Sequence, residues 1–159
     1  MKTFKGFFIV VFLMTAFALS GYSQINVGGT VGADYRNDGF YIEIAPQIGY
    51  KYKIFEFGVN PFVLYSEGND HLSAGIRVYT EATVWKSLFL HAEFQAANNY
   101  ISMESKRGWV LGLPIGVGWA QPIQDNLVFK GMILWDVLHK DGYSAQKNPI
   151  FRVGLVYSL

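Results

Sequence analysis

The sequence predicts an all-β fold: an eight-stranded antiparallel up-and-down transmembrane β-barrel, preceded by a cleaved signal peptide. Three observations lead to this fold class. From residue 25 onward the hydrophobic pattern has a period of two over long runs. Eight segments carry the pattern, and bacterial outer-membrane barrels have an even number of antiparallel strands. The connections between the segments alternate between short ones and longer, more polar ones.

Residues 1–23 have the features of a secretory signal peptide. Two lysines precede an apolar run over residues 7–19, and small residues follow it up to Ser23. The run holds about a dozen residues, whereas a helix needs roughly 20 to span a bilayer. Cleavage after Ser23 is therefore favoured over a retained amino-terminal anchor. The mature chain, residues 24–159, then fits one domain.

Charge and cysteine content narrow the class of protein further. The chain has 13 basic and 12 acidic side chains, and the signal peptide contains two of the lysines. No basic patch suited to a nucleic-acid backbone remains, so we expect no nucleic-acid partner. The chain has no cysteine, so a secreted domain of this size cannot rely on disulfides. A closed, hydrogen-bonded barrel in lipid is an alternative source of stability.

The predicted strands follow one another to the carboxy terminus. They are residues 25–35, 40–53, 55–65, 71–84, 88–96, 109–120, 127–138 and 151–159. The clearest is 40–53, where apolar residues occupy the even positions, and polar or small residues most of the odd ones, so that the two sets point to opposite faces. The pattern is blurred in 127–138, because Met132 and Leu134 share a face with Lys130 and Asp136.

The connections predict which end of the barrel faces which compartment. The short ones are residues 53–54, 85–87 and 121–126; the longer ones are 66–70, 97–107 and 139–149. Residues 36–39 are short but contain Asp-Gly, which favours a tight hairpin. Short turns are periplasmic in outer-membrane barrels. We therefore expect a protein of the bacterial outer membrane with both termini periplasmic.

Aromatic residues on the apolar faces have the spacing of a membrane span. Trp109 and Trp119 lie ten residues apart. Ten residues extend roughly 33 Å along a strand, and a tilt of about 40° projects this to roughly 25 Å, the height of the apolar band of such barrels. The predicted interface aromatics are Phe40, Tyr50, Phe55, Tyr65, Trp109, Trp119, Trp135 and Tyr157.

The polar faces predict a charged interior. An eight-stranded barrel has a lumen barely wide enough for side chains, which suits the small and charged face better than the aromatic one. The predicted lumen network consists of Glu43, Lys51, Glu56, Arg77, Glu81, His91, Glu93, Lys130, Asp136 and Arg152. Four of these residues are permanent cations and five are acids, so we expect paired charges and a largely plugged lumen rather than an open pore. The competing prediction is a soluble lipocalin-like carrier with its apolar face inside.

Two arrangements of residues in the sequence are candidate sites of chemistry. His71 and Ser73 share one strand face and resemble, in spacing, the His-x-Ser of lipid A deacylases, but a serine hydrolase also needs an orienting carboxylate and an oxyanion hole. His91 and Glu93 lie two residues apart, and the chain has only three histidines, so a metal site is disfavoured. We therefore expect no cofactor and no metal, and a lipid-modifying enzyme is the alternative function.

Several segments resemble a family of small outer-membrane β-barrel proteins common in Bacteroidota, which are mostly uncharacterised. The segments are 44–50, 87–94, 116–123 and 133–138. The architecture is also similar to that of OmpX and the OmpA membrane domain. Residues 151–159 resemble the carboxy-terminal strand recognised by barrel-assembly machinery, although Leu159 replaces the usual final aromatic. The resemblance implies outer-membrane lipids and that machinery as partners, and a non-enzymatic role in envelope structure or surface interaction.

Overall fold

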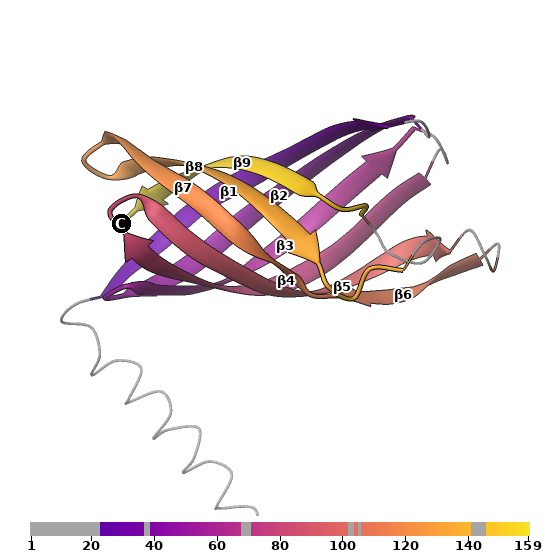
Figure 1. The fold of residues 1–159 in the computed structure, drawn as a ribbon, viewed down its shortest axis with the longest axis horizontal. Coiled ribbons are helices and arrows are strands. Elements are labelled where there is room, and N and C mark those ends of the chain that lie inside the picture. The colour runs from indigo at the N-terminus through magenta and orange to yellow at the C-terminus, as the bar shows by residue number, and fades with distance from the viewer. Residues whose placement is uncertain (1–22, 37–38, 68–70, 102–103, 105, 141–145) are drawn as a thin grey trace, which may run out of the picture.

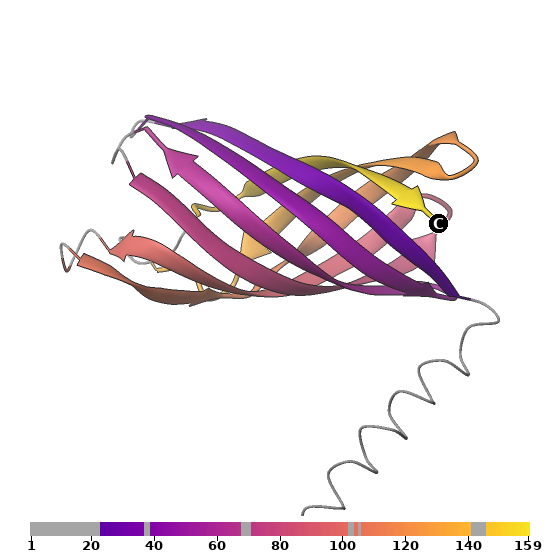
Figure 2. The same cartoon turned by 180° about the vertical axis from the view of Figure 1, so that it is seen from behind.

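The computed structural model describes residues 23–159 except 37–38, 68–70, 102–103, 105 and 141–145. The predicted signal peptide thus lies outside the described residues, apart from Ser23, which begins the first strand. Figures 1 and 2 show the described chain as a single tilted barrel. Among the described residues, no helix has the length and apolar character needed to cross a membrane.

The barrel is built from nine strand segments in an up-and-down order. They are β1 (Ser23–Arg36), β2 (Gly39–Tyr52), β3 (Phe55–Ser66), β4 (His71–Trp85), β5 (Leu88–Ile101), β6 (Lys106–Gly112), β7 (Pro114–Gln124), β8 (Leu127–Asp136) and β9 (Ile150–Ser158). β6 and β7 are the two parts of one long strand interrupted at Leu113, because both pair with β5. β1 pairs with β9, which closes the sheet. The result is the predicted eight-stranded antiparallel barrel.

The turns at the end of the barrel near the termini have two residues each. They are 53–54, 86–87 and 125–126, and the last is shorter than the predicted 121–126. Lys53 and Lys86 have positive φ angles of 55° and 44°. Two-residue hairpins favour positive φ, because this turn geometry matches the twist of the flanking strands. At the other end, Arg36 pairs with Gly39, so Gly39 is the first residue of β2 and not a central residue of the predicted Asp-Gly turn.

The predicted loop 97–107 is wrong. β5 continues to Ile101 and β6 begins at Lys106, with Asn98 opposite Trp109. This hairpin continues beyond the end of β8 (Figure 1). The backbone hydrogen-bond ladder continues there, but the side chains no longer alternate between apolar and polar. The reason is that this part of the hairpin extends beyond the lumen, so neither of its faces has to line a polar interior.

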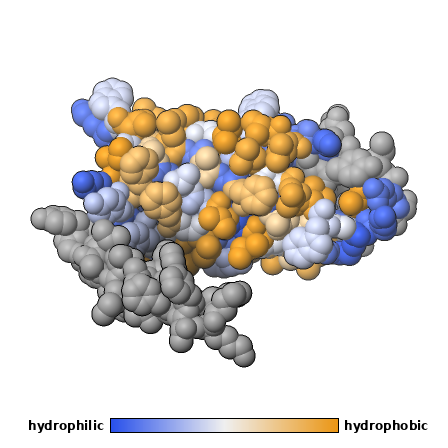
Figure 3. Space-filling model, turned by 90° about the horizontal axis from the view of Figure 1, so that it is seen from below, coloured by the Kyte–Doolittle hydropathy of each residue, from blue (hydrophilic) through white to orange (hydrophobic). Residues whose placement is uncertain are grey.

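The burial pattern confirms the predicted direction of the faces. Trp109 and Trp119 are 68% and 50% exposed, whereas Glu43, Arg77 and Glu93 are at most 3% exposed. In Figure 3 hydrophobic side chains cover much of the middle of the wall, and hydrophilic ones gather towards the ends. A soluble carrier requires the reverse arrangement, with charges outside.

The interior also contains apolar side chains that the expectation of a polar lumen did not include. One cluster consists of Ala45, Phe62, Leu64 and Ala97, and the other of Phe89, Met132, Leu134 and Ile150. Met132 and Leu134 therefore face inward, which explains the blurred pattern of β8. These side chains fill the space beside the ion pairs, so part of the lumen is packed as an ordinary protein core.

Candidate functional site: the charged lumen

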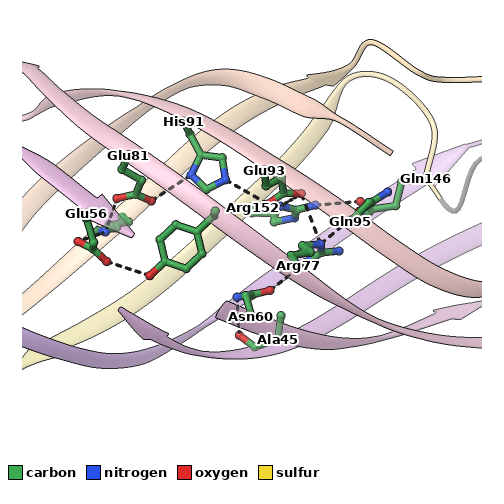
Figure 4. A network of polar contacts seen from close by, with 12 residues as sticks. Ala45, Glu56, Asn60, Arg77, Glu81, His91, Glu93, Gln95, Gln146 and Arg152 are labelled. Atoms are coloured by element: carbon green, nitrogen blue, oxygen red, sulfur yellow. Dashed lines mark hydrogen bonds and ion pairs between the residues drawn. The ribbon is translucent and has the colours of Figure 1, made fainter. Parts of the chain in front are cut away.

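The most distinctive feature of the interior is a network of ionic side chains supplied by six strands. Four carboxylates, Glu43, Glu56, Glu81 and Glu93, come from β2, β3, β4 and β5 respectively. The basic side chains are Arg77 on β4, His91 on β5, Lys130 on β8 and Arg152 on β9. All eight are buried, and each occupies an inward position of its strand. Figure 4 shows how Glu56, Arg77, Glu81, His91, Glu93 and Arg152 lie toward one another inside the barrel.

Arg77 is the centre of one part of the network. Its two terminal nitrogens donate to the two carboxylate oxygens of Glu43, at 2.8 Å and 2.5 Å. Its Nε donates to Gln95 Oε1 at 3.2 Å and lies 3.4 Å from Glu93 Oε1. The guanidinium carbon is 3.6 Å from the centre of the Phe62 ring. A planar guanidinium can make these paired and stacked contacts together, whereas an ammonium group cannot.

Arg152 joins the same two carboxylates from the other side of the lumen. One terminal nitrogen donates to both oxygens of Glu93, at 2.9 Å and 2.8 Å. Its Nε lies 3.0 Å from Glu43 Oε1. The other terminal nitrogen donates to Gln146 Oε1 at 2.9 Å, and Gln146 Nε2 donates to Glu43 Oε2 at 2.5 Å. The connection between β8 and β9 therefore contributes one side chain to the network.

Lys130 is the centre of the second part, nearer the short turns. Its Nζ donates to Glu56 at 3.1 Å and to Glu81 at 2.5 Å. Glu56 also accepts hydrogen bonds from the hydroxyl of Tyr79 at 2.9 Å and from Asn26 Nδ2 at 3.0 Å. A buried carboxylate with several donors is stabilised as the anion, because hydrogen bonds from these donors replace the ones that its oxygen atoms would make with water.

His91 links the two parts. Its Nδ1 lies 3.1 Å from Glu81 and its Nε2 lies 3.0 Å from Glu93, while its ring stacks on Tyr79. Carboxylates only accept hydrogen bonds, and a neutral imidazole donates from one nitrogen. The group of His91, Glu81 and Glu93 must therefore hold one extra proton for both contacts to be hydrogen bonds. With that proton on the imidazole, the four carboxylates of the network face four positive charges.

The network lies between two cavities of the barrel. Near the short turns, Glu56, Glu81 and Lys130 line a cavity of about 190 Å³. Near the longer connections, Glu43 and Gln146 line a smaller one of about 30 Å³. Within the described part of the chain, no three or more His, Cys, Asp or Glu side chains are grouped so that they could hold a metal ion.

Solved structures share this architecture. The chain superposes on a de novo designed transmembrane β-barrel with a TM-score of 0.51 and 12% identity, over 86% of this chain and 95% of that one. It superposes on Neisserial surface protein A (NspA) with the same TM-score and identity, over 86% of this chain and 97% of that one. The fold is that of a transmembrane β-barrel. None of the known protein families matches the sequence, and no curated protein does.

Two of the ten residues predicted for the lumen network lie elsewhere in the barrel or bond differently. Lys51 is exposed and lines the mouth of the cavity near the short turns. Asp136 is buried, but it accepts hydrogen bonds from the backbone N–H groups of Leu113 and Leu138, at 2.8 Å and 3.0 Å. The other eight contact one another directly.

Neutral polar side chains of the network were missed by sequence reasoning, which selected charges. Asn26, Tyr79 and Gln95 lie at inward positions of their strands, so the alternation alone could have found them. Gln146 could not have been found in this way, because it comes from a connection without periodicity.

The remaining predicted residues fall into two groups. Ser73 is 2% exposed, and its hydroxyl donates to Asn99 Oδ1 at 2.5 Å; the side chain of His71 lies outside the described part of the structure. The predicted interface aromatics are on the outer wall: seven of them are exposed and Tyr50 is half-buried.

Proposed function

We propose that this protein is an integral barrel of the bacterial outer membrane, with a non-enzymatic role in envelope structure or surface interaction. The observation that carries the proposal is the inverted burial: large apolar side chains cover the outer wall while charged ones are enclosed. Such a wall is unfavourable in water, because contiguous exposed apolar surface drives association. In a bilayer the same wall is matched to its surroundings.

The experiment that tests membrane insertion is the migration of the detergent-extracted protein on a gel before and after boiling. A closed barrel resists dodecyl sulfate until it is heated, so the two samples should migrate differently. The protein should also sediment with membranes after lysis and require detergent for release. Identical migration, or recovery in the soluble fraction, contradicts the proposal.

We further propose that the mature protein begins after Ser23 and that both termini are periplasmic. The amino-terminal sequence of the purified protein tests the cleavage site, and the absence of cysteine from the sequence makes the orientation testable by labelling. Glu67→Cys lies in an exposed position after β3, and Asp125→Cys lies in the exposed turn between β7 and β8. An impermeant maleimide applied to intact cells should label Glu67→Cys and not Asp125→Cys. The opposite pattern contradicts the orientation.

The lumen is proposed to be closed to ions. Support comes from the ion pairs of Arg77 and Arg152, which lie between the two cavities, and from the two apolar clusters beside them. In planar bilayers the protein should show no stable conductance steps, whereas an open pore would show them. Gln146→Ala removes the side chain that bridges Glu43 and Arg152, and this variant should show a measurable ion conductance that the unmodified protein lacks.

A surface role fits the similarity in fold to Neisserial surface protein A, which its name describes as a surface protein. The proposal includes membership of the Bacteroidota family and recognition of residues 151–159 by barrel-assembly machinery. Both points rest on the sequence resemblance. The enzymatic alternative gains no support from Ser73, whose hydroxyl is buried and engaged with Asn99. Unchanged lipid A in cells carrying Ser73→Ala is the expected result, and altered lipid A contradicts a non-enzymatic role.

A further inference from the structure

In the part of the chain that the structure describes, the barrel wall is incomplete along one seam between β6 and the end of β8. β8 pairs with β7 as far as Asp136, which lies opposite Pro114. Beyond that point β6 continues, and among the described strands it pairs with β5 alone (Figure 1). A backbone hydrogen bond from Val137 N to Leu113 O, at 3.2 Å, crosses the seam next to this pair.

The sequence explains why the ladder stops there. Pro114 has no N–H to donate, and proline in a strand is found at edges and bulges for that reason. The N–H of Leu113 turns to the carboxylate of Asp136 instead of to a strand partner. The chain after β8 then leaves the wall. The end of β8 is held by the side chain of Asn148, which forms hydrogen bonds with both the N–H and the carbonyl of Asp136.

A cavity of about 740 Å³ occupies the seam. On one side it is lined by Ile101 and by β6 residues Trp109, Val110 and Leu111; on the other side it is lined by residues 137–140. Trp109, Leu111, Val137 and Leu138 are exposed on the outer wall. The cavity is therefore continuous with the apolar surface of the barrel, and its volume lies in the range of ligand-binding cavities.

We propose that this seam binds one acyl chain of an anionic membrane lipid. The inference rests on the proposed membrane location, since it takes its ligand from the surrounding bilayer. The apolar lining matches the acyl chain. Lys140, which is exposed at the end of the lining segment, provides a basic group for the headgroup, whereas His139 Nδ1 lies 3.1 Å from the carbonyl oxygen of Gln146. An amphiphile with a negative head and an apolar tail complements both features.

The shape of the seam favours an acyl chain over a strand from another protein. Strands in a sheet lie about 4.8 Å apart and project side chains to both faces. A strand added to β6 would have to displace residues 137–140, which already form the opposite side of the cavity. A flexible, unbranched chain fills the slot without that displacement.

The test uses tryptophan fluorescence, because Trp109 lines the cavity. The protein has four tryptophans, so W85F/W119F/W135F leaves Trp109 as the single fluorophore. The matched control removes all four and carries Phe40→Trp, which is on β2 at the same end of the barrel but is separated from β6 by three strands. Both proteins are placed in nanodiscs of phosphatidylcholine containing a small fraction of phosphatidylglycerol with brominated acyl chains, which quench tryptophan on contact.

We expect saturable quenching of Trp109 at a brominated-lipid fraction about fivefold lower than that needed for the control, the factor that one basic residue near anionic lipid supplies. With brominated phosphatidylcholine this advantage should shrink, and Lys140→Gln should reduce the preference for the anionic lipid. Equal quenching at both positions overturns the inference while leaving the membrane location intact. A lack of quenching at both positions contradicts the membrane location itself. If two copies can be crosslinked through β6 and Trp109 shows no preferential quenching, the inference is overturned, because a second copy of the protein and not a lipid then occupies the seam.

Discussion

The two sides of the barrel wall differ in strand length and in the charges that they direct inward. β1–β5, the long-strand side, have 12–15 residues each. The other side, called the short-strand side, contains β8 and β9, with 10 and 9 residues, and the strand interrupted at Leu113, whose parts β6 and β7 have 7 and 11. All four network carboxylates come from the long-strand side. Lys130 and Arg152 come from the short-strand side, so its two cations meet the acids across the lumen.

This division shows how the ion pairs contribute to the fold. Neighbouring strands are already joined by backbone hydrogen bonds, so an ion pair between them adds little connectivity. Lys130 and Arg152 instead connect β8 and β9 with strands β2 to β5 on the other side. The network therefore stabilises the barrel by connecting strands that are not neighbours in the sheet, through ion pairs across the lumen. Its cost of desolvation is offset only if every charge keeps its partners.

The largest expected effect comes from removing the ion pairs that one cation makes across the lumen. Arg152→Met removes the contacts to Glu43 and Glu93 and leaves buried carboxylates short of a partner, which should cost about 3–5 kcal/mol in the free energy of unfolding. Urea unfolding of the barrel in detergent micelles measures the loss. The control is Lys51→Met, an exposed basic residue outside the network, which should change stability by less than about 0.5 kcal/mol. Equal losses in the two variants contradict the comparison.

The next effect concerns close packing on the short-strand side. A methyl group at Gly116 would meet the backbone carbonyl of Ile133 on β8 well inside van der Waals contact. Backbone cannot move aside as a flexible side chain can, so Gly116→Ala should cost about 3 kcal/mol, the upper part of the range for overpacking. Gly131→Ala is the matched control on β8, because the nearest atom to its methyl group is 3.9 Å away. Similar unfolding midpoints for the two variants would contradict this explanation.

A smaller effect is expected at the seam. Asp136→Ala leaves the N–H groups of Leu113 and Leu138 without their acceptor, at a cost of about 2 kcal/mol for two modest hydrogen bonds. Amide hydrogen exchange should accelerate at Leu113 before it does so in β1–β5. Asp136→Asn keeps one oxygen acceptor and should show a smaller change. Uniform acceleration over the whole barrel would mean that the seam is not a local feature.

The smallest effect lies in the turns of the long-strand side. Lys53 has a φ of 55°, a conformation that asparagine adopts more readily than lysine. Lys53→Asn should therefore stabilise the barrel by about 0.5 kcal/mol. Lys53→Val should destabilise it, because a β-branched side chain is strained at positive φ. The same unfolding assay resolves the sign, and stabilisation by valine would contradict the turn geometry.

The strand pattern could be predicted well because it depends on local properties. Alternation over segments such as 40–53 identified both the strands and their inward faces, and eight of the ten predicted lumen residues contact one another. Lys51 could not be separated from them, because alternation gives the face of a residue and not its depth in the lumen. Prediction failed for the β5–β6 hairpin, where the side chains carry no alternation although the backbone ladder continues.

By itself, then, the sequence determined the fold class, the number of strands and the direction of each face, because a side-chain period of two is a property of the individual strand. The tertiary structure decided which acid meets which base, since partners such as Glu56 and Lys130 are 74 residues apart and meet only when the barrel closes. It also decided that the wall opens beside Pro114, because a missing hydrogen bond becomes a seam only when the neighbouring strand has ended.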